Sequence, residues 1–224
     1  MPLGIITAIA ACPAIIGTTE AVRQGQKQNA KEKHRGLKSN LFVSCRVNSK
    51  QGKMIDGAQV VLCQDKLWLA LPTVGDPLPP SESEDHPFAG YFLPFPDQPW
   101  GRAGEGLVST ISNSPPLLNW IYVDRQTHEV KYGLRGVADP HVVGPWDCTK
   151  VEKRLTLEGW EGFVAVRYAP GEWALYFDRD DDGLGGILEP KVKRLEVELV
   201  RREMRTPRVE REDVMADGTE EKQG

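Results

Sequence analysis

The sequence predicts an all-β protein, either a β-sandwich or a partly closed barrel of about nine to eleven short strands, with a helical arm at its N-terminus. Short apolar runs alternate with polar residues at a period of two through most of the chain after residue 40. The 22 glycines and 17 prolines among 224 residues divide these runs with turns. The chain has neither a GxGxxG nor a P-loop motif, and strand and helix patterns do not alternate, which excludes the usual nucleotide-dependent enzymes.

The chain divides into three predicted regions. Residues 1–39 form the arm, residues 40–202 form the all-β domain, and residues 203–224 form a tail that we expect to be disordered because it lacks apolar periodicity. Within the domain, residues 72–87 are rich in proline and acidic residues without any periodicity, so they are expected to form a surface loop.

The arm opens with an uncharged stretch at residues 3–18 and then becomes polar. As a helix, the uncharged stretch would be ~24 Å long, shorter than the ~30 Å hydrocarbon core of a bilayer, and Pro13 interrupts it. Three interpretations stay open, namely a helix docked on protein, a membrane-contacting segment and a cleaved signal. One helix is expected from Ala14 to about His34, ended by Gly36.

Charge is segregated between the arm and the rest of the chain. Residues 1–40 carry six Lys/Arg against two Glu, a net charge of +4, so the remainder carries −8. An acidic body repels phosphate backbones, which argues against nucleic-acid binding. The basic arm suits an anionic membrane or an unidentified protein partner.

The four cysteines are Cys12, Cys45, Cys63 and Cys148. They form no CxxC pair and lie near no HxxxH motif, so the pattern does not predict a zinc site. A chain of this length needs no disulfides for stability, and we expect reduced thiols. The corresponding location is cytoplasmic, with membrane association through the arm and secretion as the alternatives.

In the first half of the domain, Leu41, Val43, Cys45 and Val47 alternate with polar neighbours and predict a strand. Residues 51–57 are expected to be a loop. Residues 58–71 are either two short strands around Gln64–Lys66 or one long bent strand, and residues 88–95 are a further short strand.

The second half has clearer hairpins. Residues 119–135 and residues 163–178 each contain two β-rich runs around a turn, and the second pair surrounds Pro170–Gly171. Trp173, Leu175 and Phe177 would share one face. Residues 154–160 form another strand, and residues 191–205 are a strand by their period of two, with a helix as the alternative.

Two stretches of the sequence resemble a known group of proteins. They are the N-terminal ACPAIIGTTEAVRQGQKQNAKEKHRG and the C-terminal half, which includes NWIYVDRQTHEVKYG, HVVGPWDCT, LTLEGWEGFVAV and WALYFDRDDDGLGG. Together they resemble uncharacterised proteins from filamentous ascomycete fungi. The resemblance implies a eukaryotic, intracellular setting and carries over neither an activity nor site residues.

The stretch FDRDDDGLGGILEP meets the calcium-loop pattern D-x-D-x-D-G-x5-E. Asp178, Asp180, Asp182 and Glu189 are the candidate calcium ligands, because alternate carboxylates on a tightly turned backbone can converge on one cation. The preceding run is a strand rather than a helix, and Pro190 follows Glu189 directly, which differs from an EF-hand. The alternative is a solvated acidic turn whose aspartates cap backbone amides.

Trp120 and Tyr122 lie on one face of a predicted strand, opposite Ile121 and Val123. If both faces are apolar, either the strand is central in the core or the Trp120–Tyr122 face is a ligand surface. Aromatic faces on β-sandwiches suit carbohydrates, and they also suit ordinary core packing.

No catalytic residue is predicted, because no Ser-His-Asp triad motif and no zinc-ligand spacing occurs. The preferred function is a non-enzymatic interaction module tethered by its arm. A calcium-dependent β-sandwich module for carbohydrate or protein is the first alternative. The second alternative is a hydrolase, whose sign would be Glu158, Glu172 or Cys148 in a cleft beside a histidine.

Overall fold

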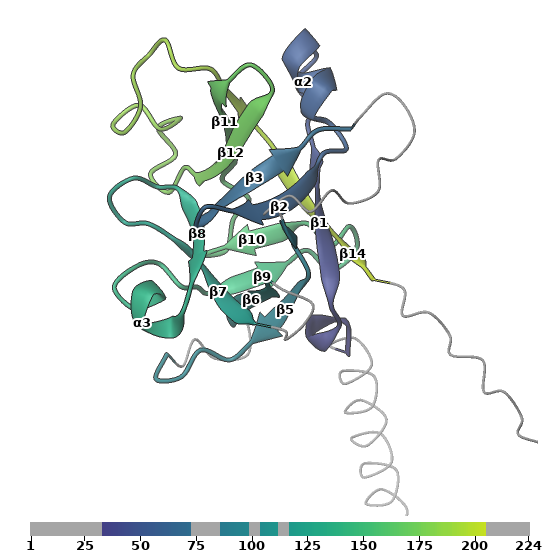
Figure 1. Cartoon of the computed structure of the whole chain (residues 1–224), viewed down its shortest axis with the longest axis vertical. Coiled ribbons are helices and arrows are strands. Elements are labelled where there is room, and N and C mark those ends of the chain that lie inside the picture. The colour runs from purple at the N-terminus through teal and green to yellow at the C-terminus, as the bar shows by residue number, and fades with distance from the viewer. Residues whose placement is uncertain (1–32, 73–85, 99–103, 112–116, 205–224) are drawn as a thin grey trace, which may run out of the picture.

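The structure is a computed structural model that describes residues 33–72, 86–98, 104–111 and 117–204 (Figure 1). Fourteen strands, two short α-helices and one 3₁₀-helix lie in these residues. The strands are β1 (Ser39–Ser44), β2 (Gln59–Cys63), β3 (Lys66–Ala70), β4 (His86–Pro87), β5 (Gly90–Leu93), β6 (Gly106–Thr110), β7 (Leu118–Val123), β8 (Val130–Gly133), β9 (Trp146–Cys148), β10 (Leu155–Leu157), β11 (Phe163–Ala169), β12 (Glu172–Phe177), β13 (Arg194–Glu196) and β14 (Glu198–Glu203). The helices are η1 (Lys33–Gly36), α2 (Lys50–Ile55) and α3 (Arg135–Ala138).

The predicted all-β class is confirmed, and of the two expected architectures the barrel is the one found. Seven strands close into a ring in the order β3, β8, β7, β6, β5, β1 and β2, and β2 pairs with β3 again. All pairings are antiparallel. Strands β12, β11 and β13 extend the sheet from β3, β14 pairs with β1, and β9 and β10 form a separate pair. The strands exceed the predicted nine to eleven because several have only two or three residues, too few to give a periodic pattern.

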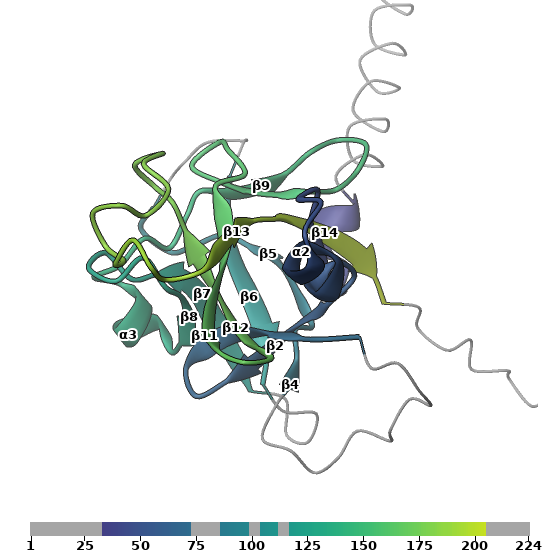
Figure 2. The same ribbon diagram turned by 90° about the horizontal axis from the view of Figure 1, so that it is seen from above.

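The main core lies where the inward faces of the strands meet (Figure 2). Leu41 and Val43 of β1 point into it, as the alternation predicts. Strand β12 is buried on both faces: Trp173, Leu175 and Phe177 join the main core, and its other face joins a second cluster around Leu184. The predicted shared face of these three residues is therefore confirmed.

The two predicted hairpins are found, and a third forms at residues 58–71, where the sequence left two interpretations open. β2 pairs with β3, β7 with β8, and β11 with β12. Residues 58–71 form two short strands rather than one long bent strand. Gln64 and Asp65 adopt φ angles of 47° and 62°, as the tight two-residue turn between the strands requires. Residues 191–205 contain β13 and β14, so the helix alternative is wrong.

The loop predicted at residues 51–57 is wrong, because most of it forms helix α2. The Ser49 hydroxyl accepts a hydrogen bond from the Gly52 backbone N–H at 2.9 Å and so caps the helix. Ile55 is fully buried and anchors the helix on the core. A helix of six residues is too short for a helical period to stand out in the sequence.

Several predictions concern residues outside the described part of the chain. The arm up to residue 32, most of the loop at 72–87 and the tail from residue 205 lie there. At the borders, Lys33–Gly36 form η1 and His86–Pro87, expected in the loop, form the short strand β4. Among the described helices, none has the length and apolarity that a membrane crossing needs.

The backbone packs closely at Gly90, where β5 pairs with β1 on one side and with β6 on the other. β1 and β5 are joined through the pair Ser39 and Gly90, and the Ser39 hydroxyl donates to the Gly90 carbonyl at 3.2 Å. A Cβ at Gly90 would lie 2.2 Å from the Val108 carbonyl oxygen and 2.4 Å from the Phe88 ring. The neighbours are backbone and a buried ring, so they cannot yield cheaply.

We therefore expect Gly90→Ala to lower the free energy of unfolding by about 1–3 kcal/mol, the usual cost of overpacking a core. Gly136→Ala is the matched control, because a Cβ at Gly136 meets no atom within 4 Å. Urea unfolding of both variants checks this. Equal midpoints for Gly90→Ala and the wild type would contradict the close packing at Gly90.

Candidate functional site

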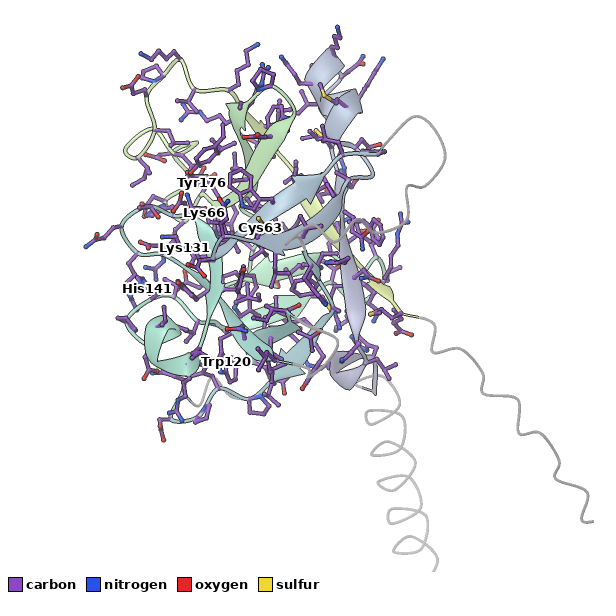
Figure 3. All side chains as sticks on the ribbon, viewed as in Figure 1. Cys63, Lys66, Trp120, Lys131, His141 and Tyr176 are labelled. Atoms are coloured by element: carbon purple, nitrogen blue, oxygen red, sulfur yellow. The ribbon has the colours of Figure 1, made fainter. Side chains whose placement is uncertain are left out.

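An open cleft of about 450 Å³ lies beside the β2–β3 turn and against strands β7 and β8 (Figure 3). Its volume lies in the range of about 300–1,000 Å³ that is typical of ligand pockets. The β2–β3 turn supplies part of the lining, and Leu134 and Val137 at helix α3 supply another part. The lining residues are Gln64, Asp65, Lys66, Asn119, Tyr122, Lys131, Tyr132, Gly133, Leu134 and Val137.

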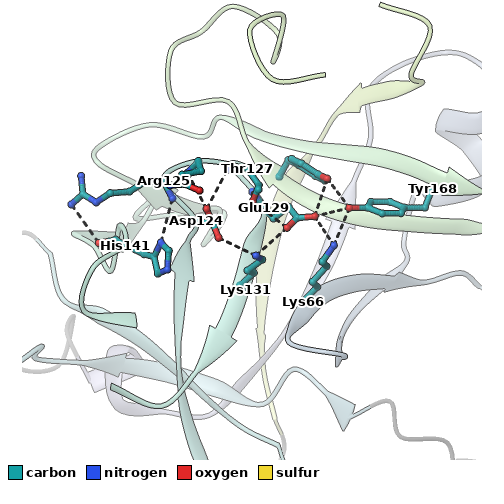
Figure 4. Close-up of polar contacts among 10 residues, drawn as sticks. Lys66, Asp124, Arg125, Thr127, Glu129, Lys131, His141 and Tyr168 are labelled. Carbon is teal, nitrogen blue, oxygen red and sulfur yellow. Dashed lines mark hydrogen bonds and ion pairs between the residues drawn. The ribbon is translucent and has the colours of Figure 1, made fainter. Parts of the chain in front are cut away.

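The carboxylate of Glu129 lies behind the cleft and organises its polar side (Figure 4). Its Oε1 accepts hydrogen bonds from Lys66 Nζ at 2.5 Å, from the Tyr168 hydroxyl at 2.6 Å and from the Tyr176 hydroxyl at 3.1 Å. Its Oε2 accepts from the Thr127 hydroxyl at 3.1 Å and pairs with Lys131 at 3.2 Å. Burial raises the pKa of Glu129, but these donors outweigh burial and lower the pKa to about 2.

Asp124 completes this network on the other side of Lys131. Lys131 Nζ donates to Asp124 Oδ2 at 2.9 Å, and Asp124 Oδ1 accepts the backbone N–H groups of Gln126 and Thr127 at 2.9 and 3.1 Å. Burial raises the pKa of Asp124, but the Lys131 bond and the two backbone bonds lower it to about 2. These contacts fix the position of Lys131 and close the β7–β8 turn.

The cleft therefore offers a neutral-to-acidic polar side and an apolar side. Both lysines that line it are already paired with Glu129 and Asp124, and Asp65 adds a further carboxylate at the rim. Leu134 and Val137 form the apolar rim and are 67% and 52% exposed. Such a cleft can hydrogen-bond hydroxyl groups and pack against C–H surface, and it gives an anionic ligand little net attraction.

Of the two predicted aromatic ligand residues, only Tyr122 lines the cleft. Trp120 and Tyr122 share the face opposite Ile121 and Val123, as expected. Trp120 packs edge-on against Phe95 with ring centroids 4.7 Å apart, so it serves packing. Tyr122 is almost fully buried, and it lines the cleft and stacks on His141 at 4.9 Å. Burial raises the pKa of Tyr122, which keeps its hydroxyl protonated as a donor.

The acidic turn uses two of its aspartates as backbone caps. Asp178 accepts the N–H groups of Asp182 and Gly183 at 3.2 and 2.7 Å, and Asp182 accepts those of Gly185 and Gly186 at 3.0 and 2.9 Å. Glu189 pairs with Lys191 on the surface, and Asp180 is exposed. In the part of the chain that the structure describes, no three His, Cys, Asp or Glu side chains are grouped to hold a metal. Calcium binding stays a prediction.

The candidates for the hydrolase alternative lie in different places. Glu158 shares a second cleft of about 240 Å³ with His141, but both of its oxygens are held by Arg179 at 2.7 and 2.6 Å. Glu172 is exposed at the start of β12. Cys148 Sγ lies 3.6 Å from His34 Nε2, a pair that joins residues 114 positions apart.

The sequence interpretation missed Lys66, Glu129 and Lys131. The sequence does contain a sign of Glu129 and Lys131. Two residues of opposite charge stand two positions apart at the start of a predicted strand, so their side chains are expected on the same face. Nothing in the sequence indicates Lys66, which becomes the strand partner of Lys131 only when β3 pairs with β8.

We expect the wild type to lose stability as the pH falls from about 5 to about 2. A glutamate side chain has an ordinary pKa of 4.5, and Glu129 in the folded protein has a pKa of about 2. The ionised Glu129 therefore stabilises the folded state fully above the unfolded pKa, and this stabilisation is lost as the pH falls through the folded pKa. The loss should be about 2–3 kcal/mol. Glu129→Gln should remove this part of the dependence, and the exposed Glu189→Gln should not. Unfolding measured across this range checks it, and parallel wild-type and Glu129→Gln curves would contradict it.

A second prediction separates capping from calcium binding. Asp178→Ala should destabilise the protein by about 1–2 kcal/mol with calcium or with a chelator, because it leaves two backbone N–H groups without their acceptor. Asp180→Ala should melt like the wild type in both conditions, because Asp180 is exposed. Thermal melting of the full chain is the measurement. A calcium-dependent rise in melting temperature that Asp180→Ala abolishes would instead support the metal site.

The comparisons with known proteins agree with this architecture. The chain matches the model of a fungal beta-trefoil domain over residues 17–205. Neither a curated protein nor a solved structure matches it. The matched range includes every described strand, and the match supports the resemblance to a fungal group without naming an activity. The chain belongs to the fungal beta-trefoil domain family.

Proposed function

We propose that the protein is a non-enzymatic binding module whose cleft at the β2–β3 turn takes a neutral carbohydrate. The observation that carries the proposal is the charge compensation of the lining. Lys66 and Lys131 are both neutralised within the protein, so a ligand meets fixed polar groups without a net positive field.

The remaining lining residues support the same ligand class. Asn119, Asp65 and the Tyr122 hydroxyl offer hydrogen-bond acceptors and donors at fixed positions, while Leu134 and Val137 offer an apolar surface. A sugar presents hydroxyl groups at its edge and C–H groups on its faces, so it can use both. β-Trefoil domains often serve as lectin-like binding modules, which favours the proposal at the level of the fold.

The tether is a separate part of the proposal. The arm carries a net charge of +4 against a body of −8, which suits attachment to an acidic protein partner or an anionic membrane surface. Its uncharged residues 3–18 are the segment proposed to contact a membrane. Most of the arm lies outside the described residues, so its role stays a prediction. Turnover of a substrate by the purified protein, lost on a point mutation, would contradict the non-enzymatic assignment.

We expect the full chain to bind neutral oligosaccharides on a glycan array and Val137→Asp to weaken the binding at least about tenfold, because a charge on the rim breaks the apolar contact. Val151→Asp is the matched control: Val151 is 88% exposed and does not line the cleft. Asp65→Asn tests the polar side without straining the turn, because asparagine tolerates the positive φ of this position.

Calorimetric titration with the best array ligand gives the affinities. The proposal fails if no neutral glycan binds, or if only sulfated or phosphorylated glycans bind. It also fails if Val137→Asp and Val151→Asp bind equally well, since the ligand would then lie elsewhere.

A further inference from the structure

A buried cation away from the cleft has no carboxylate partner among the residues that the structure describes. Arg201 of β14 is only 7% exposed. Its Nε donates to the Ser39 hydroxyl at 3.0 Å, its Nη2 to the carbonyls of His34 and Leu37 at 3.4 Å, and its guanidinium lies over the Phe92 ring at 4.4 Å. Among the described residues, no carboxylate lies within ion-pair distance of it. Burial lowers the pKa of Arg201, as expected for an undercompensated cation.

The group that faces this cation is the thiol of Cys148. Arg201 Nη1 donates to Cys148 Sγ at 3.8 Å. An arginine cannot give up its proton, and a buried charge is costly unless an opposite charge lies near it. A negative charge on Cys148 Sγ would supply that opposite charge. The side chain of Asp147, the preceding residue, is already occupied by an ion pair with Arg35.

A proton acceptor for the thiol stands on the other side of the sulfur. His34 Nε2 lies 3.6 Å from Cys148 Sγ and 3.3 Å from Lys153 Nζ. A lysine ammonium has only donors, so this contact requires Nε2 to be the unprotonated ring nitrogen. Nε2 therefore carries a lone pair that accepts the Cys148 proton once Lys153 turns its ammonium away from it, and Arg201 then stabilises the sulfur anion. Helix η1, strand β9 and strand β14 bring these groups together (Figure 2).

We infer that Cys148 is a modification site, a thiol that hydrogen peroxide oxidises to a sulfenic acid. The Cys148 proton moves to His34 Nε2, and the sulfur attacks one peroxide oxygen. An S–O bond forms as the O–O bond breaks, the sulfur is oxidised and the peroxide is reduced. The departing hydroxide takes the proton from His34 and leaves as water. Peroxide is small enough to reach a partly buried sulfur.

The chain contains its own reference thiol. Cys45 is also partly buried, but its sulfur donates to the Glu196 carbonyl at 3.8 Å instead of accepting from a cation. The two thiols have opposite hydrogen bonding, which allows their reactivity to be compared within one molecule. Arg202 is the matched control for Arg201, because it is the next residue on β14 and its guanidinium lies over Phe42.

The test is treatment of the full reduced chain with limiting hydrogen peroxide in the presence of dimedone, followed by site-resolved mass spectrometry. We expect Cys148 to be labelled roughly tenfold faster than Cys45. Arg201→Met and His34→Gln should each bring the rate at Cys148 towards that at Cys45, and Arg202→Met should leave it unchanged. Arg201→Lys should be intermediate and serves if Arg201→Met does not fold.

Two outcomes would overturn the inference. Equal labelling of Cys148 and Cys45 in the wild type does so without any variant. Faster labelling of Cys148 that survives both Arg201→Lys and His34→Gln also does so, because exposure alone would then explain the reactivity.

Discussion

Closure of the strand ring is the constraint on which the rest of the structure depends. A sheet with open edges leaves unpaired backbone groups, and the pairing of β2 with β3 removes two such edges at once. The turn that makes this pairing, at Gln64 and Asp65, also forms part of the lining of the cleft. Strand β3 then meets β8, and Lys66 becomes the strand partner of Lys131. The architecture and the candidate site thus arise from the same hairpin.

Bringing two lysines together has an electrostatic consequence. Two ammonium groups on neighbouring strands repel each other unless an anion lies close to both. Glu129 supplies the anion, with Asp124 as a second partner for Lys131. Three hydroxyl groups satisfy the remaining lone pairs of Glu129, so the buried carboxylate is fully hydrogen-bonded. A network of this kind is rigid, which favours recognition by preformed groups over rearrangement on binding.

The buried charge of Arg201 is surrounded by neutral groups, unlike the buried charge of Glu129. Glu129 has two cationic partners, whereas Arg201 has carbonyls, a hydroxyl and a sulfur. Charge compensation at Glu129 makes the cleft suitable for a neutral ligand, and missing compensation at Arg201 makes Cys148 suitable for carrying negative charge. The two regions therefore differ in chemistry, and they also differ in construction: Lys66 and Lys131 lie on neighbouring strands of the large sheet, whereas Arg201 and Cys148 lie on strands of different sheets.

The sequence by itself determined the fold class and the local pairings. Alternation at a period of two and turn residues such as Pro170–Gly171 are local signals, and hairpins are local structures, so β7–β8 and β11–β12 could be predicted. Helix α2 escaped prediction because its six residues give too little pattern. Only the tertiary structure decided that the strands close into a ring, that Lys66 meets Glu129 across 63 positions, and that Cys148 meets Arg201 across 53. These contacts depend on which distant strands become neighbours, and periodicity along a strand carries no information about its partner.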